Sequence, residues 1–330
     1  MYLQGPQWRK NVQKIIDAIS RLPVSDWRNR KLAVAFSGGM DSLFLLLALK
    51  ELQKKYGYTL LPVYIDHGFL AEDSLYGDVA RIVARKIGLN CRILKSEAIF
   101  SCNNLEEQMR IERYRQLKKF LQVQKAEYIV VAHHADDQAE TILANLIRGC
   151  GIAGLAGMAE VNGVIFRPLL KISKGDIRSM ILATRFPYYE DKLNYSKKGR
   201  RNQLRNTILP LFERTTGVSL AERLLTLGEN MTDINDFFLE EENRIKQKIC
   251  FTAIKNKAYE FSRIEFLKLP IFWRRATIKK LFFLFAKSIP SRKDILKIDS
   301  WIEAGRKPKL NFKKITWERT KDKKIILSDL

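Results

Sequence analysis

Residues 31–42 read KLAVAFSGGMDS, and a second apolar run, LFLLLAL, follows at 43–49. The first run has the composition of a buried strand, and the second is long and leucine-rich enough for a helix. Gly38 and Gly39 give the turn between them conformational freedom and let a ligand approach the backbone closely. A helix that begins there directs free N–H groups and the positive end of its dipole into the turn. The sequence therefore predicts a phosphate-binding turn between a strand and a helix.

Asp41 distinguishes this turn from an ordinary glycine turn, in which it would serve only as a helix N-cap. A carboxylate repels phosphate unless a Mg²⁺ ion lies between them, so Asp41 is a candidate magnesium ligand. The spacing matches neither the Walker A loop, GxxxxGK(S/T), nor the dinucleotide fingerprint, GxGxxG. SGGMDS resembles instead the SGGxDS pyrophosphate loop of the ATP-pyrophosphatase (PP-loop) superfamily, whose members transfer AMP to a substrate oxygen and release pyrophosphate.

The chain carries a strong positive charge. It has 330 residues, with 59 Lys and Arg against 36 Asp and Glu, a formal net charge of +23. Such an excess favours a polyanionic partner, although a lysine-rich genome would make every protein basic. Residues 241–330 hold 24 Lys and Arg against 10 Asp and Glu. We therefore expect this region to bind the phosphate backbone of a nucleic acid.

The cysteines and the N-terminal residues bear on the compartment. The four cysteines form no CxxC pair, which argues against a zinc ribbon or an iron–sulfur site. The first residues lack the apolar core of a secretory signal, and no apolar stretch reaches the ~20 residues of a membrane span. We therefore expect reduced thiols, a cytoplasmic location and no membrane partner.

Strand and helix patterns alternate through the first half of the chain. The expected strands are nearly continuous apolar runs, as a parallel sheet covered on both faces requires. This predicts an α/β domain with a doubly wound, mostly parallel sheet of the adenine nucleotide α-hydrolase type, which binds ligands beyond the carboxyl ends of its strands. The expected strands are 32–36, 60–66, 91–95 and 128–132, and the expected helices are 42–55, 72–88, 105–124, 137–148 and 173–184.

The pattern changes after residue 215. Helices are expected from about 216 to the 240s, at 270–288 and at 292–305. The tail alternates like a hairpin, with one strand at 310–318 and another at 325–328. We therefore expect a catalytic domain at 1–215 and a smaller, mainly helical, basic domain for nucleic-acid binding at 216–330, and the family resemblance described below implies that this nucleic acid is tRNA.

The three histidines of the chain all follow expected strands, at the edge where ligands should bind. His133 and His134 are followed by Asp136, Asp137 and Glu140, whose i,i+3 and i,i+4 spacing puts acidic side chains on one face of a helix. These carboxylates could cap the helix, hold Mg²⁺ or bind an ammonium group. Two histidines and two aspartates also suit zinc, but a phosphate site favours oxygen-bound Mg²⁺.

Two basic segments could contact phosphate groups. Arg110 and Arg113 lie one turn apart in an expected helix, where they would either meet phosphate or pair with neighbouring glutamates. Residues 192–205 hold six basic residues and no acidic one, with Tyr195, Asn194 and Asn202 interleaved and Asn206 directly after them. Cations, an aromatic ring and amides together favour a nucleic-acid surface, although a flexible basic loop would look similar.

Together these motifs resemble the tRNA(Ile)-lysidine synthase family over most of residues 30–212. SGGMDS alone marks the superfamily, whereas the block from HHADD to GLAGM followed by RPLL is far more specific. Leu193 departs from the family, which usually has the serine of a D-x-S-N stretch there, so we assign it no role. In the family's order, the matching segments are SGGMDS, DHG, NLEEQMRIERY, AHHADDQAETILANLIRGCGIAGLAGM, RPLL and RNQLRNTILP.

The resemblance implies a ligase that acts on the wobble cytidine (C34) of a tRNA(Ile) with a CAU anticodon. ATP, with Mg²⁺, would adenylate the C2 oxygen of the cytidine. The ε-amine of L-lysine would then displace AMP and give lysidine. The oligomeric state stays open, a dimer included.

The resemblance also implies roles for single residues. Asp41, Arg113, Asp137 and Glu140 would be catalytic, and Asp137 and Glu140 would bind lysine and help to deprotonate its amine. Asp41 and Asp136 would hold Mg²⁺, and Arg113, with Arg110, would neutralise charge on the phosphate. ATP would contact Ala35, Ser37, Gly38, Gly39, Met40, Asp41, Ser42, Ile65, Arg148 and Gly149, and RNA would contact Lys197, Lys198, Arg200, Arg201 and Arg205.

Three alternatives remain from the residues alone. A tRNA thiolase of the same superfamily usually needs a CxxC pair or a catalytic cysteine, and only Cys150 lies beside a motif. An amide-forming NAD or GMP synthetase leaves the basic C-terminal region unexplained. A non-catalytic nucleotide- or RNA-binding protein leaves Asp41 and the Asp136–Asp137 pair unexplained.

Overall fold

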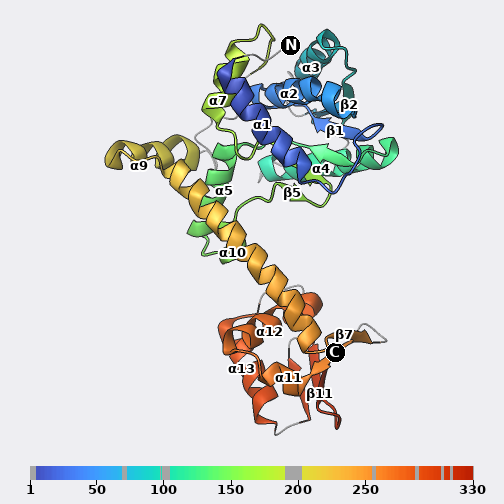
Figure 1. Ribbon diagram of the computed structural model, residues 1–330, viewed down its shortest axis with the longest axis vertical. Helices are drawn as coiled ribbons and strands as arrows, with labels where there is room; N and C mark the ends of the chain where they lie inside the picture. Colours follow the sequence, from blue (N-terminus) through green and yellow to red (C-terminus); the bar gives the residue numbers. More distant parts are fainter. Residues whose placement is uncertain are drawn as a thin grey trace. The chain divides into compact units, whose positions relative to one another are not determined.

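The computed structural model divides the chain into two compact units, Met1–Thr232 and Asp233–Leu330 (Figure 1). The division falls inside helix α10 (Leu220–Lys248), one long helix that contributes residues to both units. The sequence placed the boundary at 215, before this helix begins. The structure describes residues 5–68, 73–96, 98, 105–189, 203–254, 258–286, 290–305, 308–312 and 315–329.

A six-stranded sheet with strand order β3-β2-β1-β4-β6-β5 forms the centre of the first unit. Strand β1 lies between β2 and β4, where Ala33 is paired with Leu61 on one side and Ile129 on the other. All pairs are parallel except β5 with β6, which confirms the predicted doubly wound, mostly parallel sheet. The strands are β1 (Lys31–Ala35), β2 (Thr59–Asp66), β3 (Arg92–Lys95), β4 (Tyr128–Val130), β5 (Val161–Asn162) and β6 (Ile165–Phe166).

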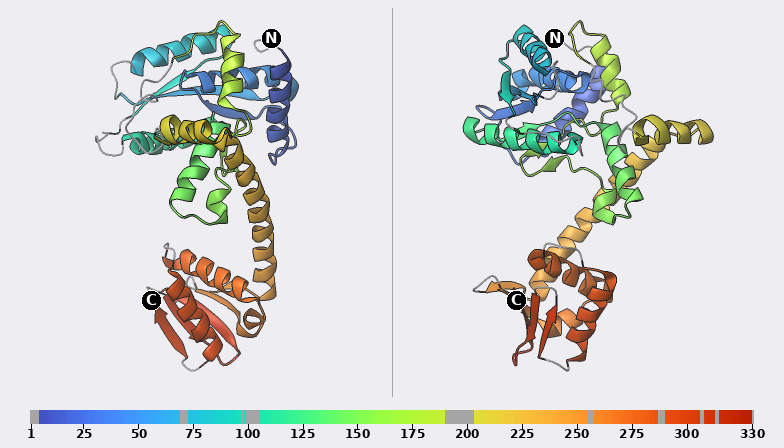
Figure 2. Two further views of the ribbon diagram at one scale, coloured as in Figure 1. Left: turned by 90° about the vertical axis from the view of Figure 1, so that its left-hand side faces the viewer. Right: turned by 180° about the vertical axis from the view of Figure 1, so that it is seen from behind.

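Helices cover both faces of this sheet (Figure 2). Alternate residues of β1 enter different cores: Leu32 and Val34 pack with the helices of one face, and Ala33 packs with Leu117 and Phe120 of α4 on the other. The helices that the sequence predicted in this region are confirmed, and α1, α6, η2 and α9 are additional. They are α1 (Pro6–Ser20), α2 (Met40–Tyr56), α3 (Asp73–Lys86), α4 (Leu105–Gln124), α5 (Ala135–Ile147), α6 (Ile152–Leu155), α7 (Lys174–Leu182), the π-helical η2 (Leu204–Ile208) and α9 (Leu209–Thr216).

Helix α2 is buried on nearly every side, which explains its continuous apolar sequence. Residues 43–49 are all completely buried. The ring of Phe44 meets Trp8 of α1 edge to face, with 6.3 Å between centroids. The helix ends at Gly57, whose left-handed backbone (φ 76°) lets its N–H reach the carbonyl of Gln53 at 2.8 Å. Tight packing thus holds the N-terminus of α2 firmly under the glycine turn.

The second unit combines helices with a five-stranded antiparallel sheet of order β7-β8-β11-β10-β9. Its core contains Phe261, Phe266, Phe282 and Trp317. The expected helices are confirmed, but β7 and β8 were not expected, because β7 is exposed and short. The elements are α11 (Arg263–Leu267), α12 (Ile271–Ala286), α13 (Arg292–Ala304), β7 (Thr252–Ile254), β8 (Ala258–Ser262), β9 (Lys309–Phe312), β10 (Ile315–Arg319) and β11 (Lys324–Asp329).

The expectation of a single strand at 310–318 was wrong. Phe312 pairs with Ile315 in an antiparallel ladder, so the chain reverses direction between them and forms two strands, β9 and β10. The pairing of β10 with β11 confirms the second half of the predicted hairpin. The apolar alternation shifts by one residue at the reversal, from Leu310 and Phe312 to Ile315 and Trp317, and this shift was the available signal.

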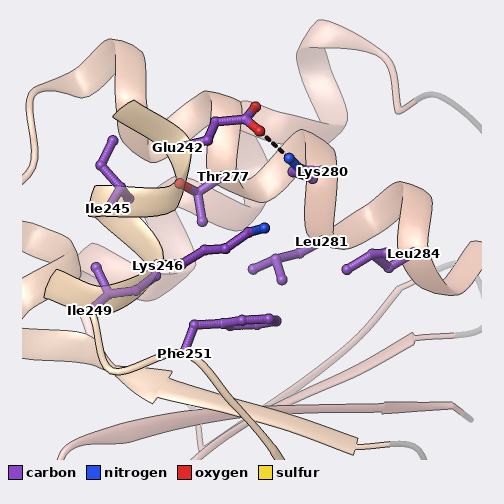
Figure 3. Close-up of a pocket in the computed structure, with 9 residues that line it drawn as sticks. All are labelled: Glu242, Ile245, Lys246, Ile249, Phe251, Thr277, Lys280, Leu281 and Leu284. Atoms are coloured by element: carbon purple, nitrogen blue, oxygen red, sulfur yellow. Dashed lines mark hydrogen bonds and ion pairs between the residues drawn. The ribbon is translucent and has the colours of Figure 1, made fainter. Parts of the chain in front are cut away.

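A small apolar hollow lies in the second unit, between the end of α10 and α12. Phe251 lies along one side of it, and the Glu242–Lys280 ion pair lies at the other (Figure 3). Within the described part of the chain, no helix is both long and apolar enough to cross a membrane.

We expect Phe44→Ala to lower the free energy of unfolding of the first unit by about 3–5 kcal/mol, because the lost ring leaves a cavity beside Trp8. Hydrogen exchange of peptides from α2 and β1 measures this change locally. Leu146→Ala is the control, since Leu146 is 49% exposed and should change exchange little. Equal effects of the two substitutions would contradict the packing described here.

Candidate active site

The glycine turn between β1 and α2 has the geometry of a phosphate site. Gly38 has φ 81°, a conformation that disfavours any side chain, and Gly39 is the N-cap of α2. The hydroxyl of Ser42 donates to the carbonyl of Gly39 at 2.9 Å. The hydroxyl of Ser37 lies 3.1 Å from the hydroxyl of Ser42. The turn therefore presents a helix N-terminus and two hydroxyl groups to the same place.

Asp41, in the first turn of α2, has a buried oxygen suited to a cation. Its Oδ1 atom accepts no hydrogen bond from the described residues, while the side chain as a whole is 31% exposed. A buried carboxylate oxygen without a donor is costly unless a cation or water satisfies it. The donor atom thus fits Mg²⁺, which prefers oxygen ligands and keeps several of them from phosphate or water.

His134 joins the turn to the start of α5. Its side chain is almost completely buried, with Nε2 3.7 Å from Asp41 and 3.4 Å from Asp137 and with Nδ1 3.6 Å from Asp136. Burial alone would lower the pKa of His134, but the three carboxylates outweigh burial and raise the pKa to about 10. The imidazole is therefore charged at neutral pH and lies between Asp41 and Asp136, the two expected magnesium ligands.

Asp136 is tied to the neighbouring helix. Its carboxylate accepts the N–H of Lys174, at the start of α7, at 2.8 Å. Burial would raise the pKa of Asp136, but the neighbouring His134 imidazole and the hydrogen bond from the Lys174 N–H outweigh it and lower the pKa to about 2. This contact fixes α7 against the acidic start of α5.

Asp137 and Glu140 lie together, as their spacing predicted, and both contact Arg205. Asp137 accepts the backbone N–H of His134 at 3.1 Å and the guanidinium of Arg205 at 3.0 Å. Glu140 is 1% exposed and forms an ion pair with the same guanidinium. Desolvation would lower the pKa of Arg205, but these carboxylates raise it. Two carboxylates in this place thus bind a cation.

Among the described residues, the carboxylates of this cluster outnumber the cations. Asp41, Asp136, Asp137 and Glu140 contribute four carboxylates, and His134 and Arg205 contribute two cations. Buried charge of one sign is costly unless it is compensated, so the cluster favours the binding of further positive charge. Within the described ranges, no group of three or more His, Cys, Asp and Glu side chains is arranged to hold a metal ion by itself. The described residues therefore give the zinc alternative no complete set of protein ligands.

The glycine-rich segment after α5 is held by two side chains of that helix. Gln138 donates to the carbonyls of Ala156 and Met158 at 3.2 and 3.1 Å and accepts the Met158 N–H at 2.7 Å. Asn145 donates to the carbonyl of Gly154 at 2.7 Å. These amides explain why Gln138 and Asn145 accompany the acidic residues on α5.

The expected adenosine contacts lie on the same unit, and their role stays a prediction. Ala35 ends β1, and Ile65 lies in β2 beside it. Arg148 and Gly149 follow α5, about 16 Å along the helix from Asp137 at 1.5 Å per residue. Gly149 has φ 73°, a left-handed conformation that, as at Gly38, favours glycine over other residues.

The two arginines of α4 differ. Arg110 forms an ion pair with Glu107 at 2.8 Å and lies over the Tyr114 ring, which matches a solvated helix face. Arg113 is exposed and forms no ion pair within the described part of the chain. A phosphate-neutralising role therefore stays a prediction for Arg113 and has less support for Arg110.

Some expected RNA contacts lie outside the described residues, namely Lys197, Lys198, Arg200 and Arg201, as does Leu193. Arg205 is described, and its guanidinium contacts the carboxylates rather than projecting freely for RNA. His134 is the central residue to which the sequence assigned no role. Its position in AHHADD, between a strand end and an acidic helix start, was the available signal.

A glycine turn at a helix N-terminus, beside a carboxylate at the carboxyl edge of a parallel sheet, defines a nucleotide-phosphate-binding α/β domain. The family model described as a PP-loop domain matches residues 8–212, more than half of the chain. The chain therefore belongs to the PP-loop domain family.

Several curated proteins similar to this chain bear the name tRNA(Ile)-lysidine synthase. One from Thermosipho africanus is 28% identical over 78% of this chain and 61% of its own length. One from Porphyromonas gingivalis is 34% identical over 68% of this chain and 50% of its own length. One from Wolbachia pipientis is 36% identical over 56% of this chain and 44% of its own length. The chain thus spans roughly half the length of the curated relatives it matches.

A solved structure shares the fold. The U34-tRNA thiolase NcsA from Methanococcus maripaludis, solved with its 4Fe-4S cluster, superimposes with a TM-score of 0.58 at 19% identity. The match covers 69% of this chain and 80% of that chain. At this identity the likeness supports the architecture and not the chemistry.

We expect Arg205→Met to lower the free energy of unfolding of the first unit by about 3 kcal/mol, because Glu140, which is 1% exposed, would lose its ion pair with this guanidinium. Hydrogen exchange of α5 peptides measures the loss, and the double variant Arg205→Met/Glu140→Gln should recover part of it. Arg81→Met is the matched control, since the Arg81–Asp78 pair is exposed and contributes little. A double variant no better than the single one would argue against a buried ion pair.

Proposed function

We propose that this chain joins L-lysine to C2 of the wobble cytidine, C34, of a tRNA(Ile) with a CAU anticodon. ATP activates the cytidine as an adenylated intermediate, and the products are lysidine, AMP and pyrophosphate. The observation that carries the proposal is the contact of Asp41 with His134, 3.7 Å apart, which joins a pyrophosphate turn to an acidic cation site. The names of the similar proteins supply the substrate class.

The turn at Gly38 and Gly39 accepts the pyrophosphate end of ATP. The N–H groups at the start of α2 and the hydroxyls of Ser37 and Ser42 donate to its oxygens. Asp41, together with Asp136, holds Mg²⁺, which when bound neutralises charge on the phosphates. Arg113 contributes a further cation toward the phosphate that is transferred.

Asp137 and Glu140 bind the ε-ammonium group of lysine. Support comes from Arg205, a cation that both carboxylates already contact. An ammonium group has no free electron pair, so it must lose a proton before it attacks. Asp137 is the more exposed of the two carboxylates, 14% against 1%, and is placed to accept that proton.

The RNA meets a basic surface. Residues 192–205 hold six basic residues, and residues 241–330 hold 24 Lys and Arg against 10 Asp and Glu. Lys197, Lys198, Arg200, Arg201 and Arg205 bind the anticodon loop, and the cytidine is splayed out of the loop toward the nucleotide. We place the reaction in the cytoplasm, in keeping with the free cysteines Cys91, Cys150 and Cys250.

The direct test is incorporation of labelled lysine into a transcribed tRNA(Ile) with the CAU anticodon. We expect ATP-dependent and Mg²⁺-dependent labelling of this RNA, and none of methionine tRNA or of a C34→U transcript. Release of pyrophosphate without lysine incorporation would reject lysidine formation while retaining the ATP chemistry. Thiolation would then be tested with Cys150→Ser.

Asp137→Asn should abolish lysine incorporation while leaving tRNA affinity unchanged. An amide has no charge to bind the ammonium group, yet its oxygen can still accept the His134 N–H, so the helix start is preserved. Asp26→Asn, at an exposed pair with Arg28, is the control and should retain activity. Loss of tRNA binding by Asp137→Asn would contradict the role given to Asp137.

A further inference from the structure

Two tyrosine rings are stacked beside the glycine turn. Tyr76 of α3 and Tyr189, which follows α7, lie face to face with 3.9 Å between ring centroids and 4° between planes. Both side chains are half-buried. None of the contacts to phosphate, lysine or RNA described above uses them.

Tyr189 rests directly on Gly38. Its N–H donates to the Gly38 carbonyl at 3.2 Å, and its backbone forms a parallel bridge with Gly39. A Cβ atom at Gly38 would lie 3.2 Å from two ring carbons of Tyr189. The ring and the backbone of Tyr189 thus both contact the turn.

The hydrogen bond fixes the direction of one N–H group of the turn. In a trans peptide the N–H points opposite to the carbonyl. Holding the Gly38 carbonyl toward Tyr189 therefore turns the Gly39 N–H away from Tyr189. That N–H points instead toward the Ser37 hydroxyl, at 3.4 Å, which is the side where phosphate oxygens would bind.

Close packing of α3 fixes the other ring. The residue after Tyr76 is Gly77, where a Cβ atom would lie 3.0 Å from Ile93 of β3 and 3.4 Å from the ring of Tyr64 of β2. Glycine therefore lets α3 lie close against the sheet. The Tyr76 ring stacks on the Tyr189 ring, and the Tyr76 carbonyl oxygen lies 3.7 Å from the same Cβ position at Gly38.

We propose that Tyr76 and Tyr189 act as one positioning unit for the pyrophosphate turn. The stacked pair presses the Tyr189 backbone onto Gly38, holds the Gly38–Gly39 peptide in one orientation and keeps the Gly39 N–H ready for phosphate. The rings touch no substrate and act through the peptide. The inference rests on the proposed function only in that the turn binds the phosphates of ATP.

The test is the Kd of the full chain for ATP with Mg²⁺, measured by calorimetry without RNA or lysine. Removing the stack in Tyr189→Ala or Tyr76→Ala should raise this Kd by about threefold to tenfold. The double variant should be no weaker than the weaker single one, because the rings act as a unit. Tyr189→Phe keeps both the ring and the N–H and should bind ATP like the unsubstituted chain.

Tyr56→Ala is the matched control, because it removes a stacked ring from the far end of α2. Tyr56 and Tyr58 have 6.1 Å between centroids and 11° between planes. It should leave the Kd unchanged, and thermal unfolding checks that each variant is folded at the temperature of the assay. Folded Tyr189→Ala with unchanged Kd, or Tyr189→Phe as weak as Tyr189→Ala, would overturn the positioning role.

The outcomes separate the two proposals. The expected order of Kd values with no lysidine formed would retain the positioning role and reject the proposed reaction. If lysidine is formed but Tyr189→Ala leaves the Kd for ATP unchanged, the proposed reaction is retained and the positioning role is rejected. A chain that binds no ATP would overturn both.

Discussion

The site depends on one buried imidazole among three carboxylates. His134 is nearly inaccessible to solvent and lies within 3.7 Å of Asp41, Asp136 and Asp137. Acidic groups at the N-termini of α2 and α5 are each favoured by the helix dipole, but several of them close together repel one another. The charged imidazole offsets that repulsion and holds the start of α5 against the phosphate turn. Without the charged imidazole, repulsion among Asp41, Asp136 and Asp137 would oppose the approach of α5 to the phosphate turn.

The surrounding structure keeps this cluster acidic and rigid at the same time. Arg205 offsets part of the charge of Asp137 and Glu140, and the Lys174 N–H satisfies Asp136. Among the described residues, four carboxylates exceed two cations, and this excess favours positively charged ligands such as Mg²⁺ and an ammonium group. Complete burial of residues 43–49 anchors α2 below, which leaves its N-terminus as a fixed phosphate site.

Much of the fold could be predicted because local patterns matched the final environment. The strand run at 32–36 is apolar throughout and that at 60–66 is apolar up to Asp66, as strands buried on both faces must be, and SGGMDS marks the turn directly. The reversal of the tail between Phe312 and Ile315 was missed, although two consecutive lysines interrupt the apolar alternation there. Arg205 stays an expected RNA contact, and the basic segment could not show that its guanidinium also pairs with Asp137 and Glu140, 68 and 65 residues earlier in the chain. Tyr189 had no signal, because its role comes from a tertiary contact with Gly38.

The most direct measurement is transfer of label from ATP carrying a radioactive α-phosphate to the tRNA(Ile) transcript in the absence of lysine. If the pyrophosphate turn activates RNA, the label should appear on the cytidine at position 34 as AMP, and added lysine should remove it. Pyrophosphate release should match the label in amount. Label on lysine instead of RNA, or none on either, would contradict activation of the cytidine by this site.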